Sequence, residues 1–547
     1  MKRFTLFLLI GLCSLLSQAQ IKKTLNASLK PKLVVGIVID QMRWDYLTRF
    51  KALYAANGGF NRMMAEGYSF NNTMIPYAPT VTACGHTCVY TGSVPAIHGI
   101  TGNNWFDNQL LRNVYCVEDK SVKTVGSNSD SGLMSPRNML TTTIGDELKL
   151  ATNFKSKVIG IAIKDRGSIL PAGHAANAAY WYDGKSGNFI TSSYYMNDLP
   201  LWVKEINNRK MVDSFYTIGW NTFLNKSVYP EYATDDEKSY ETKPFGATAL
   251  GFPYTLSNYK GIDYSKISTT PYGNSLTIEM AKAAVINEKM GKGSATDLLA
   301  ISFSSPDYIG HAFGPNSWEM VDDYVRLDVE LGKFFQFLDA TVGKNQYTVF
   351  LTADHAVAHV AGFMKEHKLP AGTFNENGLK KELNNLVKEK FGISNLVESL
   401  SNYQVSLNHP KLDSSKQNAD AIKQTLIQFL LKKEAIANAF ETSKVLITSL
   451  PKTQREIFAN GYFPNRSGDI QIVLKSGYME GNGTGTTHGI WAPYDAHIPL
   501  LFYGWGINKG HTNKETYMTD IAPTIAALLH IQMPSGSVGK VLEEVIK

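Results

Sequence analysis

Five short apolar runs, each rich in β-branched residues, end abruptly at polar or charged side chains. The first run covers residues 33–39 and stops at Asp40, and another covers residues 347–352 and stops just before Asp354. Unbroken apolar runs of this length are typical of parallel strands that are buried on both faces of a sheet. The other three runs are residues 158–163, 298–303 and 498–503.

Helical patterns lie between these runs. One apolar stripe contains Leu276, Met280 and Ala284, and a second extends from Tyr324 to Leu338 in steps of three or four residues. Alternation of such strands and helices predicts an α/β sandwich, in which the ligand site lies beyond the carboxyl ends of the strands. Most polar clusters of this chain fall at those ends, so the functional site is expected there.

Two stretches fit this alternation poorly. Residues 175–270 are rich in Tyr, Asn, Trp and Gly, and residues 365–470 are more highly charged. Both are interpreted as insertions over or beside the site, within a single catalytic domain that covers residues 20–547. A length of 547 residues is compatible with one domain, because large single α/β domains are common.

Residues 1–19 have the pattern of a secretory signal peptide. Two basic residues precede a short apolar core, and Ser17-Gln18-Ala19 forms a small-x-small cleavage site. Cleavage after Ala19 predicts a periplasmic or secreted protein. The apolar core is too short to span a membrane, and the large leucine before Cys13 disfavours lipidation, so no stable membrane anchor is expected.

The net charge argues against nucleic acid as a partner. The formal charge is +6, and removal of Lys2 and Arg3 with the signal leaves 6 − 2 = +4. This balance is weak and scattered along the chain, which does not make the basic surface that nucleic acids require. A small-molecule substrate is expected instead, and a monomer is plausible.

Three cysteines remain after the predicted cleavage, and their spacing is not that of a metal site. Cys84 and Cys88 would lie one helical turn apart, which favours packing over a disulfide. At most one bridge is expected, with Cys88 and Cys116 as the candidate pair. Disulfides therefore do not define this fold.

Three carboxylates and three imidazoles fall at or near the predicted strand ends, a mixture of ligands that Zn²⁺ accepts. Asp307 and His311 are four residues apart and would share one face of a helical turn. A single histidine is more often a surface or core residue than a ligand, so only the complete set favours a metal site. The expected groups are Asp307, His311 and His488 for one ion, and Asp40, Asp354 and His355 for the other.

A threonine pair near residue 80 is the candidate nucleophile. Thr80 and Thr82 join an extended, proline-containing segment to a predicted helix, whose N-terminus favours a bound phosphate. A metal ion would convert a threonine hydroxyl to an alkoxide, because the free hydroxyl is a poor nucleophile at neutral pH. From the residues alone, simple capping of the helix is equally good, and the choice between the two threonines stays open.

Taken in order, these motifs resemble the alkaline phosphatase superfamily, closest to its phosphodiesterase and nucleotide pyrophosphatase branch. When two further motifs are included in the comparison, the chain is similar to the bacterial phosphate-irrepressible alkaline phosphatases of the PafA type. The likeness extends from Lys32 to Lys547, and the ordered set is highly specific although no single motif decides it. The first motifs are residues 38–43, 79–82, 92–95 with 98–99, 307–311, 352–355 and 487–489, and the further two are 102–105 and 164–166.

The resemblance implies an alkaline phosphatase-like three-layer α/β/α sandwich with a largely parallel central sheet and inserted cap regions. It implies Thr82 as the nucleophile and two zinc ions as cofactors, with Mn²⁺, Fe or Ca²⁺ at one site as alternatives. It also implies that Asn103, Lys164 and Arg166 bind the transferred phosphoryl oxygens. The implied zinc ligands are Asp40, Asp354, His355 and Thr82 for one ion, and Asp307, His311 and His488 for the other.

Two cations beside the nucleophile favour a phosphate monoester as substrate, because a monoester dianion has further charged oxygens to neutralise. Lys164 and Arg166, at positions i and i+2 on an extended chain, would share one face. Arg166 can grip two oxygens, Lys164 acts as a point charge, and Asn103 can donate from its amide. An ordinary charged loop is the alternative interpretation of Lys164 and Arg166.

Four other classes compete with a phosphomonoesterase. A phosphodiesterase or nucleotide pyrophosphatase would use the same metals and Thr82, but would need an apolar slot for the second ester group. A sulfatase needs a modified Cys or Ser in a context that Cys84 and Cys88 do not supply. Cofactor-independent phosphoglycerate mutases use serine and are normally cytosolic, and a non-catalytic phosphate-binding protein would lack some of the ligands.

Overall fold

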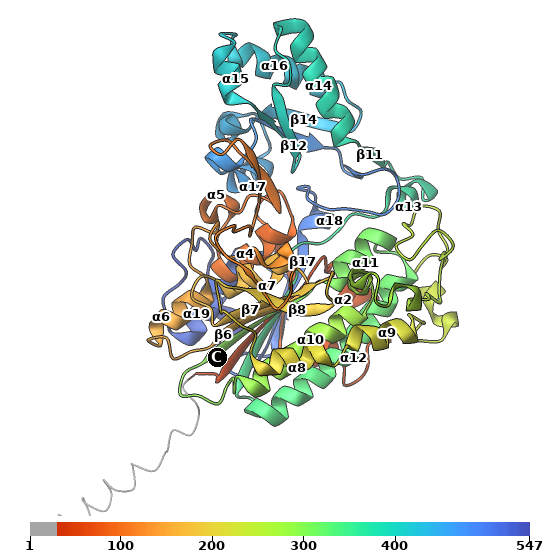
Figure 1. Ribbon diagram of the computed structural model, residues 1–547, viewed down its shortest axis with the longest axis vertical. Helices are drawn as coiled ribbons and strands as arrows, with labels where there is room; N and C mark the ends of the chain where they lie inside the picture. Colours follow the sequence, from red (N-terminus) through yellow and green to blue (C-terminus); the bar gives the residue numbers. More distant parts are fainter. Residues whose placement is uncertain (1–29) are drawn as a thin grey trace, which may run out of the picture.

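The computed structural model describes residues 30–547 (Figure 1). The expected signal peptide, its cleavage site and Cys13 lie outside these residues. An 11-stranded sheet forms the centre, in the order β18-β2-β17-β10-β1-β9-β6-β7-β8-β5, with β19 also paired to β2. In that order the strands are β18 (Gly510–Thr512), β2 (Tyr68–Met74), β17 (His497–Gly504), β10 (Tyr347–Thr352), β1 (Leu33–Ile39), β9 (Asp297–Phe303), β6 (Val158–Ala162), β7 (Ala178–Asp183), β8 (Asn188–Ser192), β5 (Thr124–Val125), and lastly β19 (Thr516–Tyr517).

The five middle strands, from β10 to β7, are parallel to one another. Every residue of β1, β6, β9 and β10 is buried, as the unbroken apolar runs predict. The run at residues 498–503 is a correction to the parallel expectation, because β17 lies antiparallel to β10. An apolar run reports burial on both faces of a sheet, and burial does not specify the direction of a strand.

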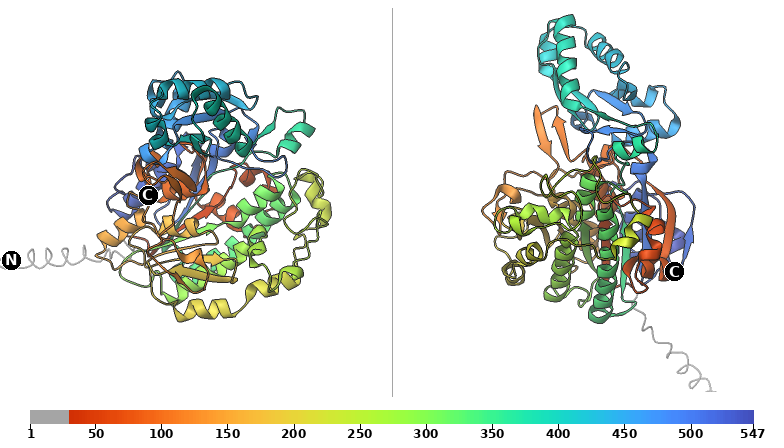
Figure 2. Two further views of the ribbon diagram at one scale, coloured as in Figure 1. Left: turned by 45° about the horizontal axis from the view of Figure 1, so that its top comes forward. Right: turned by 90° about the vertical axis from the view of Figure 1, so that its right-hand side faces the viewer.

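Helices cover both faces of the sheet (Figures 1 and 2). On one side α12 (Trp318–Leu338) packs against α3 (Gly59–Glu66) and α10 (Tyr272–Asn287), and α10 also contacts α8 (Leu201–Asn208). On the other side α4 (Thr82–Thr91) packs against α6 (Ile144–Ala151), α7 (Asp165–Ala172) and α19 (Ile521–Leu529). Both predicted apolar stripes lie in α10 and α12, which confirms the α/β class.

The central sheet extends into the first of the two expected insertions. Strands β7 and β8 occupy residues 178–192 and add to the sheet beside β6. The rest of the 175–270 stretch consists of α8, α9 (Met211–Ile218), short 3-10 turns and long connections. This part packs on the α10 and α12 side of the molecule through contacts of α8 and α9 with α10.

The second expected insertion has a sheet and a hydrophobic core of its own. Its antiparallel sheet has the order β12-β13-β15-β14, and Figure 1 shows it above the central sheet, next to helices α14 and α16. The side chains between them form a separate cluster around Leu383, Val405 and Leu426. The elements are β12 (Val397–Ser401), β13 (Gln404–Leu407), β14 (Ile436–Glu441), β15 (Ile470–Leu474), α14 (Glu376–Phe391), α15 (His409–Ser414) and α16 (Ala419–Leu430).

Shorter elements complete the chain around the carboxyl ends of the central strands. Strands β3 and β4 form a hairpin, and β11 pairs with β16. They are β3 (Asn104–Asp107), β4 (Arg112–Tyr115), β11 (Gly372–Phe374), β16 (Tyr478–Glu480), α2 (Tyr46–Arg49), α5 (Pro95–His98), α11 (Ser305–Phe313), α13 (Ala361–Glu366), α17 (Lys452–Gly461) and α18 (Pro493–Ala496).

The three described cysteines are all free and buried, so the candidate bridge between Cys88 and Cys116 is wrong. Cys88 packs in the main core, whereas Cys116 belongs to a smaller cluster with Ile100 and Trp105. Since the two thiols lie in different clusters, they cannot pair. Cys84 and Cys88 do lie one turn apart on α4, and the thiol of Cys84 donates to the carbonyl oxygen of Ile100 at 3.2 Å. Within residues 30–547 no helix has the length and apolar character that a membrane crossing requires.

Candidate metal centre and nucleophile

Four adjacent strands bring the predicted site residues to one edge of the sheet. Asp40 directly follows β1, and Asp354 lies two residues beyond β10. Asp307 is in the first turn of α11, just after β9, and Lys164 follows β6. Because β10, β1, β9 and β6 are neighbours and parallel, their carboxyl ends meet at the same place.

The first group of candidate ligands is fully buried. Asp40, Asp354 and His355 each offer one ligand atom, and these atoms lie within 4.8 Å of one another. The Nε2 atom of His355 is 3.6 Å from Oδ1 of Asp40 and 3.4 Å from Oδ2 of Asp354. A cation between them would therefore be reached by two carboxylates and one imidazole.

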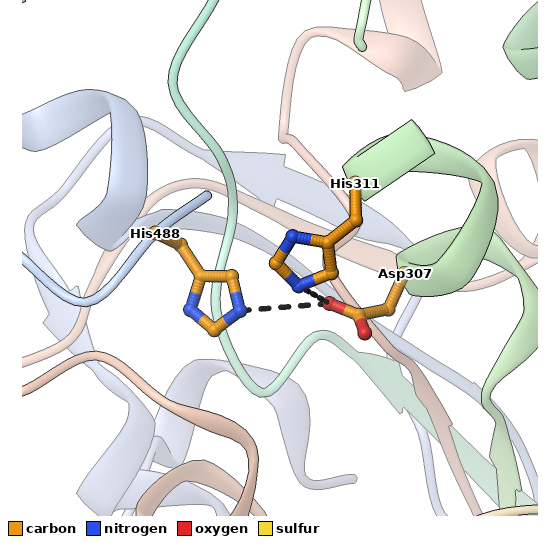
Figure 3. A group of neighbouring side chains, drawn as sticks. All are labelled: Asp307, His311 and His488. Atoms are coloured by element: carbon orange, nitrogen blue, oxygen red, sulfur yellow. Dashed lines mark ion pairs between the residues drawn. The ribbon is translucent and has the colours of Figure 1, made fainter. Parts of the chain in front are cut away.

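The second group lies beside the first and is shown in Figure 3. Asp307 and His311 project from α11, and His488 comes from the loop that precedes α18. Oδ1 of Asp307 is 3.3 Å from Nε2 of His311 and 3.6 Å from Nε2 of His488. The rings of His355 and His488 stack at 3.5 Å between centroids, so the two groups adjoin each other.

All three imidazoles present the same nitrogen to the carboxylates. The Nδ1 atoms of His311, His355 and His488 lie within 3.0 Å of backbone carbonyl oxygens. This contact holds the proton on Nδ1 and leaves Nε2 with its lone pair directed at the carboxylates, as metal-binding histidines usually have it. The carbonyls belong to Thr486, Ala356 and Thr80.

The donor set fits a pair of divalent cations. Oδ1 of Asp40 is buried and has no hydrogen-bond partner among residues 30–547, and Oδ2 of Asp354 is approached by the imidazole nitrogens of His86 and His355. Buried carboxylate oxygens are normally satisfied, so the free oxygen of Asp40 calls for a ligand. Two carboxylates with one imidazole, and one carboxylate with two imidazoles, are combinations that zinc accepts.

The electrostatics of the site agree with this interpretation. Burial, together with the charges of Asp307 and Asp354, raises the pKa of Asp40 above its ordinary value. Burial acts to raise the pKa of Asp354 as well, but the imidazoles of His355 and His86 bring it below its usual range. Three carboxylates crowded at one sheet edge repel one another, and divalent cations would relieve that repulsion.

Thr82 begins α4 at the junction of the two groups. Its hydroxyl oxygen is 3.5 Å from Nε2 of His355 and 3.5 Å from Nζ of Lys164. The hydroxyl of Thr80 instead donates to the carbonyl oxygen of Ile490 at 2.9 Å. The geometry therefore separates two threonines that the residues alone leave equivalent, and only Thr82 faces the candidate ligands.

Glycine 85 allows α4 to lie directly against the first ligand group. A Cβ atom built on Gly85 would collide with the carbonyl oxygen of Asp354. The close approach brings the first turn of α4 to the candidate ligands. The helix ends at Thr91 and is followed by Gly92, whose φ of 64° is the left-handed conformation that glycine favours.

Asn103 and Lys164 also reach this region. The side-chain oxygen of Asn103 accepts from the backbone N–H of Ala83 at 2.9 Å, which leaves its NH₂ group as the available donor. Nζ of Lys164 is 2.7 Å from Oδ2 of Asp40 and 2.5 Å from Oδ2 of Asp307. The lysine thus links one carboxylate of each ligand group.

The expectation that residues 164–166 are extended is wrong. Lys164 is extended, but α7 begins at Asp165, so Arg166 lies in the first turn of a helix. An acidic residue in the first turn is favoured by the helix dipole, which explains the start at Asp165. Nη1 of Arg166 lies 3.2 Å from the hydroxyl of Tyr115, and its buried Nε has no hydrogen-bond partner in the described part of the chain.

Two residues of this site are absent from the sequence-based prediction. His86 lies one turn after Thr82 on α4, and its Nδ1 is 3.2 Å from Oδ2 of Asp354. Gln41 donates from its backbone N–H to Asp354 and from its side chain to Asp307, at 3.1 and 2.7 Å. In the sequence, only their spacing could have indicated a role at the site. His86 is four residues after Thr82, and Gln41 directly follows Asp40.

The comparisons with known proteins identify the family. A model described as type I phosphodiesterase / nucleotide pyrophosphatase matches residues 34–492. The chain belongs to this family. The chain is also 51% identical over 518 residues to alkaline phosphatase PhoV of Synechococcus elongatus, with 95% of this chain and 93% of that protein covered.

A second relative is similar in both sequence and structure. Alkaline phosphatase PafA of Elizabethkingia meningoseptica is 48% identical over 524 residues, with 95% of each chain covered. The crystal structure of wild-type PafA matches with a TM-score of 0.93 at 48% identity, and covers 95% of this chain and 100% of that one. These matches confirm the resemblance and the alkaline phosphatase-like α/β fold with its mostly parallel central sheet.

Proposed function

We propose that this protein is an exported phosphomonoesterase that depends on two divalent cations and attacks its substrate with Thr82. The observation that carries the proposal is the position of the Thr82 hydroxyl, at the start of α4, beside His355 and Lys164 and between two candidate ligand groups. The names of PhoV and PafA, as alkaline phosphatases about half identical to this chain, support the same class of reaction.

The proposed reaction is a double displacement. The hydroxyl of Thr82 gives its proton to solvent and its oxygen attacks phosphorus in line with the leaving group, while the bond from phosphorus to the ester oxygen breaks and the departing alkoxide takes a proton from water. Water then loses a proton and attacks the phosphothreonine, the bond from Thr82 to phosphorus breaks, the oxygen of Thr82 takes a proton back, and inorganic phosphate is released. Positioning and charge stabilisation dominate such transfers, which suits a site made of fixed charges and helix N–H groups.

The chain's own residues account for the choice of a monoester. Lys164, 3.5 Å from the Thr82 hydroxyl, brings a positive charge to the non-bridging oxygens, and the free NH₂ group of Asn103 donates a hydrogen bond. The family resemblance assigns a second positive charge to Arg166, in the first turn of α7. His86 links α4 to the first ligand group. Its Nδ1 atom is 3.2 Å from Oδ2 of Asp354 and 2.9 Å from the backbone oxygen of Thr82. Small phosphate monoesters are the proposed substrates.

Two zinc ions are the proposed cofactors, held by the ligand groups around Asp40 and Asp307, with Thr82 as a further ligand of the first. When bound, they supply the positive charge that a deprotonated hydroxyl and a departing alkoxide require. Export rests on the signal-peptide pattern of residues 1–19.

Replacement of Thr82 tests the nucleophile. We expect Thr82→Ala to lower kcat/KM for p-nitrophenyl phosphate by at least about a thousandfold, because a covalent step is removed. Both metals should remain bound, as measured by elemental analysis. The control is Thr87→Ala, a buried threonine on the same helix whose hydroxyl donates to the carbonyl oxygen of Ala83. Full turnover by Thr82→Ala, or by wild-type protein after exhaustive chelation, would contradict the proposal.

A phosphodiesterase or nucleotide pyrophosphatase is the second candidate, and the description of the family model favours it. The two candidates share metals and nucleophile but differ in the charge that the substrate presents to Lys164 and Arg166. Turnover of p-nitrophenyl phosphate and bis-p-nitrophenyl phosphate by the wild-type protein separates them. A larger kcat/KM for the diester would replace the monoesterase assignment by this one.

A further inference from the structure

The segment that carries Asn103 is held from outside by the second insertion. The side-chain amide of Asn402, at the tip between β12 and β13, donates to the carbonyl oxygen of Asn104 at 2.8 Å. A Cβ atom built on Gly102 would collide with that same amide. The side chain of Asn402 therefore fits against the backbone on both sides of Asn103, where only a glycine leaves room for it.

The backbone at the tip is shaped for this contact. Asn402 and Tyr403 both have positive φ angles, 55° and 56°, and form the two-residue turn between β12 and β13. Asparagine adopts this left-handed conformation more readily than other non-glycine residues. From this turn Asn402 reaches the backbone on both sides of Asn103, whereas Tyr403 packs in the insertion's own core.

A second contact from the insertion holds the start of the same segment. The hydroxyl of Thr101 donates to the carbonyl oxygen of Arg466 at 2.8 Å. Nη1 of Arg466 in turn donates to the carbonyl oxygen of Gly99 at 2.6 Å, and its guanidinium lies over the ring of Trp105. Residues 99–104 are thus anchored to the insertion at both ends.

Tyr403 extends the tip to the loop that carries His488. Its ring is buried, and a Cβ atom on Gly489 would lie 3.4 Å from Cε2 of Tyr403. The same atom would lie 3.5 Å from the side chain of Val81, the residue before Thr82. One two-residue turn therefore touches the Asn103 segment and packs beside the segments of His488 and Thr82.

We propose that Asn402 is a positioning residue for phosphoryl transfer, through which the second insertion sets the place of Asn103. The carbonyl of Asn104 is held by Asn402, and the side-chain oxygen of Asn103 is held by the N–H of Ala83. With both contacts made, the NH₂ group of Asn103 is the donor left to face a phosphoryl oxygen. This inference rests on the role of Asn103 in the proposed function.

The sharpest test is Asn402→Asp, which keeps the shape of the side chain and its tolerance of a positive φ but replaces the donor by a repelling carboxylate. We expect kcat/KM for p-nitrophenyl phosphate to fall about three- to tenfold, the range for one hydrogen bond between uncharged groups. Inhibition by inorganic phosphate should weaken by a similar factor. The control is Asn395→Asp, which adds the same charge at another asparagine of positive φ; Asn395 is exposed and lies two residues before β12.

A double-mutant cycle distinguishes positioning from general loosening. In an Asn103→Ala background, Asn402→Asp should lower kcat/KM less than twofold, because the side chain that Asn402 positions is already absent. An equal loss in both backgrounds, or wild-type kcat/KM for Asn402→Asp, would overturn the inference. Asn402→Gly, which removes the side chain without straining the turn, provides the same comparison if the aspartate variant does not fold. Absence of phosphatase activity in the wild-type protein would instead refute the proposed function.

Discussion

Lys164 offers a decisive test of substrate class, because its ammonium group is buried between one carboxylate of each ligand group. Its Nζ is 2.7 Å from Asp40 and 2.5 Å from Asp307, and 3.5 Å from the hydroxyl of Thr82. Burial acts to lower the pKa of Lys164, but the charges of Asp307 and Asp40 raise it above its ordinary value. Lys164→Met removes the charge and keeps most of the length.

The expected loss depends on the charge of the substrate. Removing one preformed donor to a charged transition state typically costs about a hundred- to a thousandfold in rate, or about 3–4 kcal/mol. A monoester dianion has two charged oxygens free to meet the cations, and a diester has one. We therefore expect kcat/KM to fall by this factor for p-nitrophenyl phosphate and by less than tenfold for bis-p-nitrophenyl phosphate.

The matched control is Lys149→Met. Lys149 is also buried, but its Nζ donates to the carbonyl oxygen of Ser156 and to the side chain of Asn177. Neither residue belongs to the candidate ligand groups. The assay compares both substrates for wild type and both variants, with metal content measured in each preparation. Equal losses for the monoester and the diester at full metal occupancy would refute the charge argument. A monoester loss below tenfold would do the same.

Two further predictions concern stability. We expect Gly85→Ala to lower the free energy of unfolding by about 1–3 kcal/mol and to weaken metal retention, because its Cβ would collide with the Asp354 backbone. Gly293→Ala provides the control, since a Cβ there would have its nearest neighbour at 3.9 Å, and equal melting temperatures for the two variants would contradict this. A hydrogen bond to Asp146 raises the pKa of His174, so the contact stabilises the fold below the unfolded pKa of about 6.5 and is lost as the pH rises through the folded pKa. His174→Gln should therefore lower the free energy of unfolding, measured with urea, by more at pH 5 than at pH 9. The same loss at both pH values would show that this linkage is absent.

The strands that build the site were predictable because their burial is visible in the sequence. Apolar runs ending at Asp40, before Asp307 and before Asp354 are β1, β9 and β10, and they meet as neighbours. The direction of β17 was not predictable. A buried strand has the same apolar composition whether it runs parallel or antiparallel to its neighbour. The sheet's extension through β7 and β8 was also hidden, since aromatic and polar residues there made the segment look like an insertion.

Local chemistry determined the identity of the candidate ligands, and the tertiary structure decided their partners. Carboxylates and imidazoles at strand ends point to metals wherever the chain places them. Which threonine faces them follows only from the packing of α4, where Thr80 turns to the carbonyl of Ile490 and Thr82 does not. The contact of Asn402 with Asn104 joins residues 298 positions apart, and no periodicity or spacing reports such a meeting. Residue type sets what a side chain can bind, and only the folded chain sets what lies within its reach.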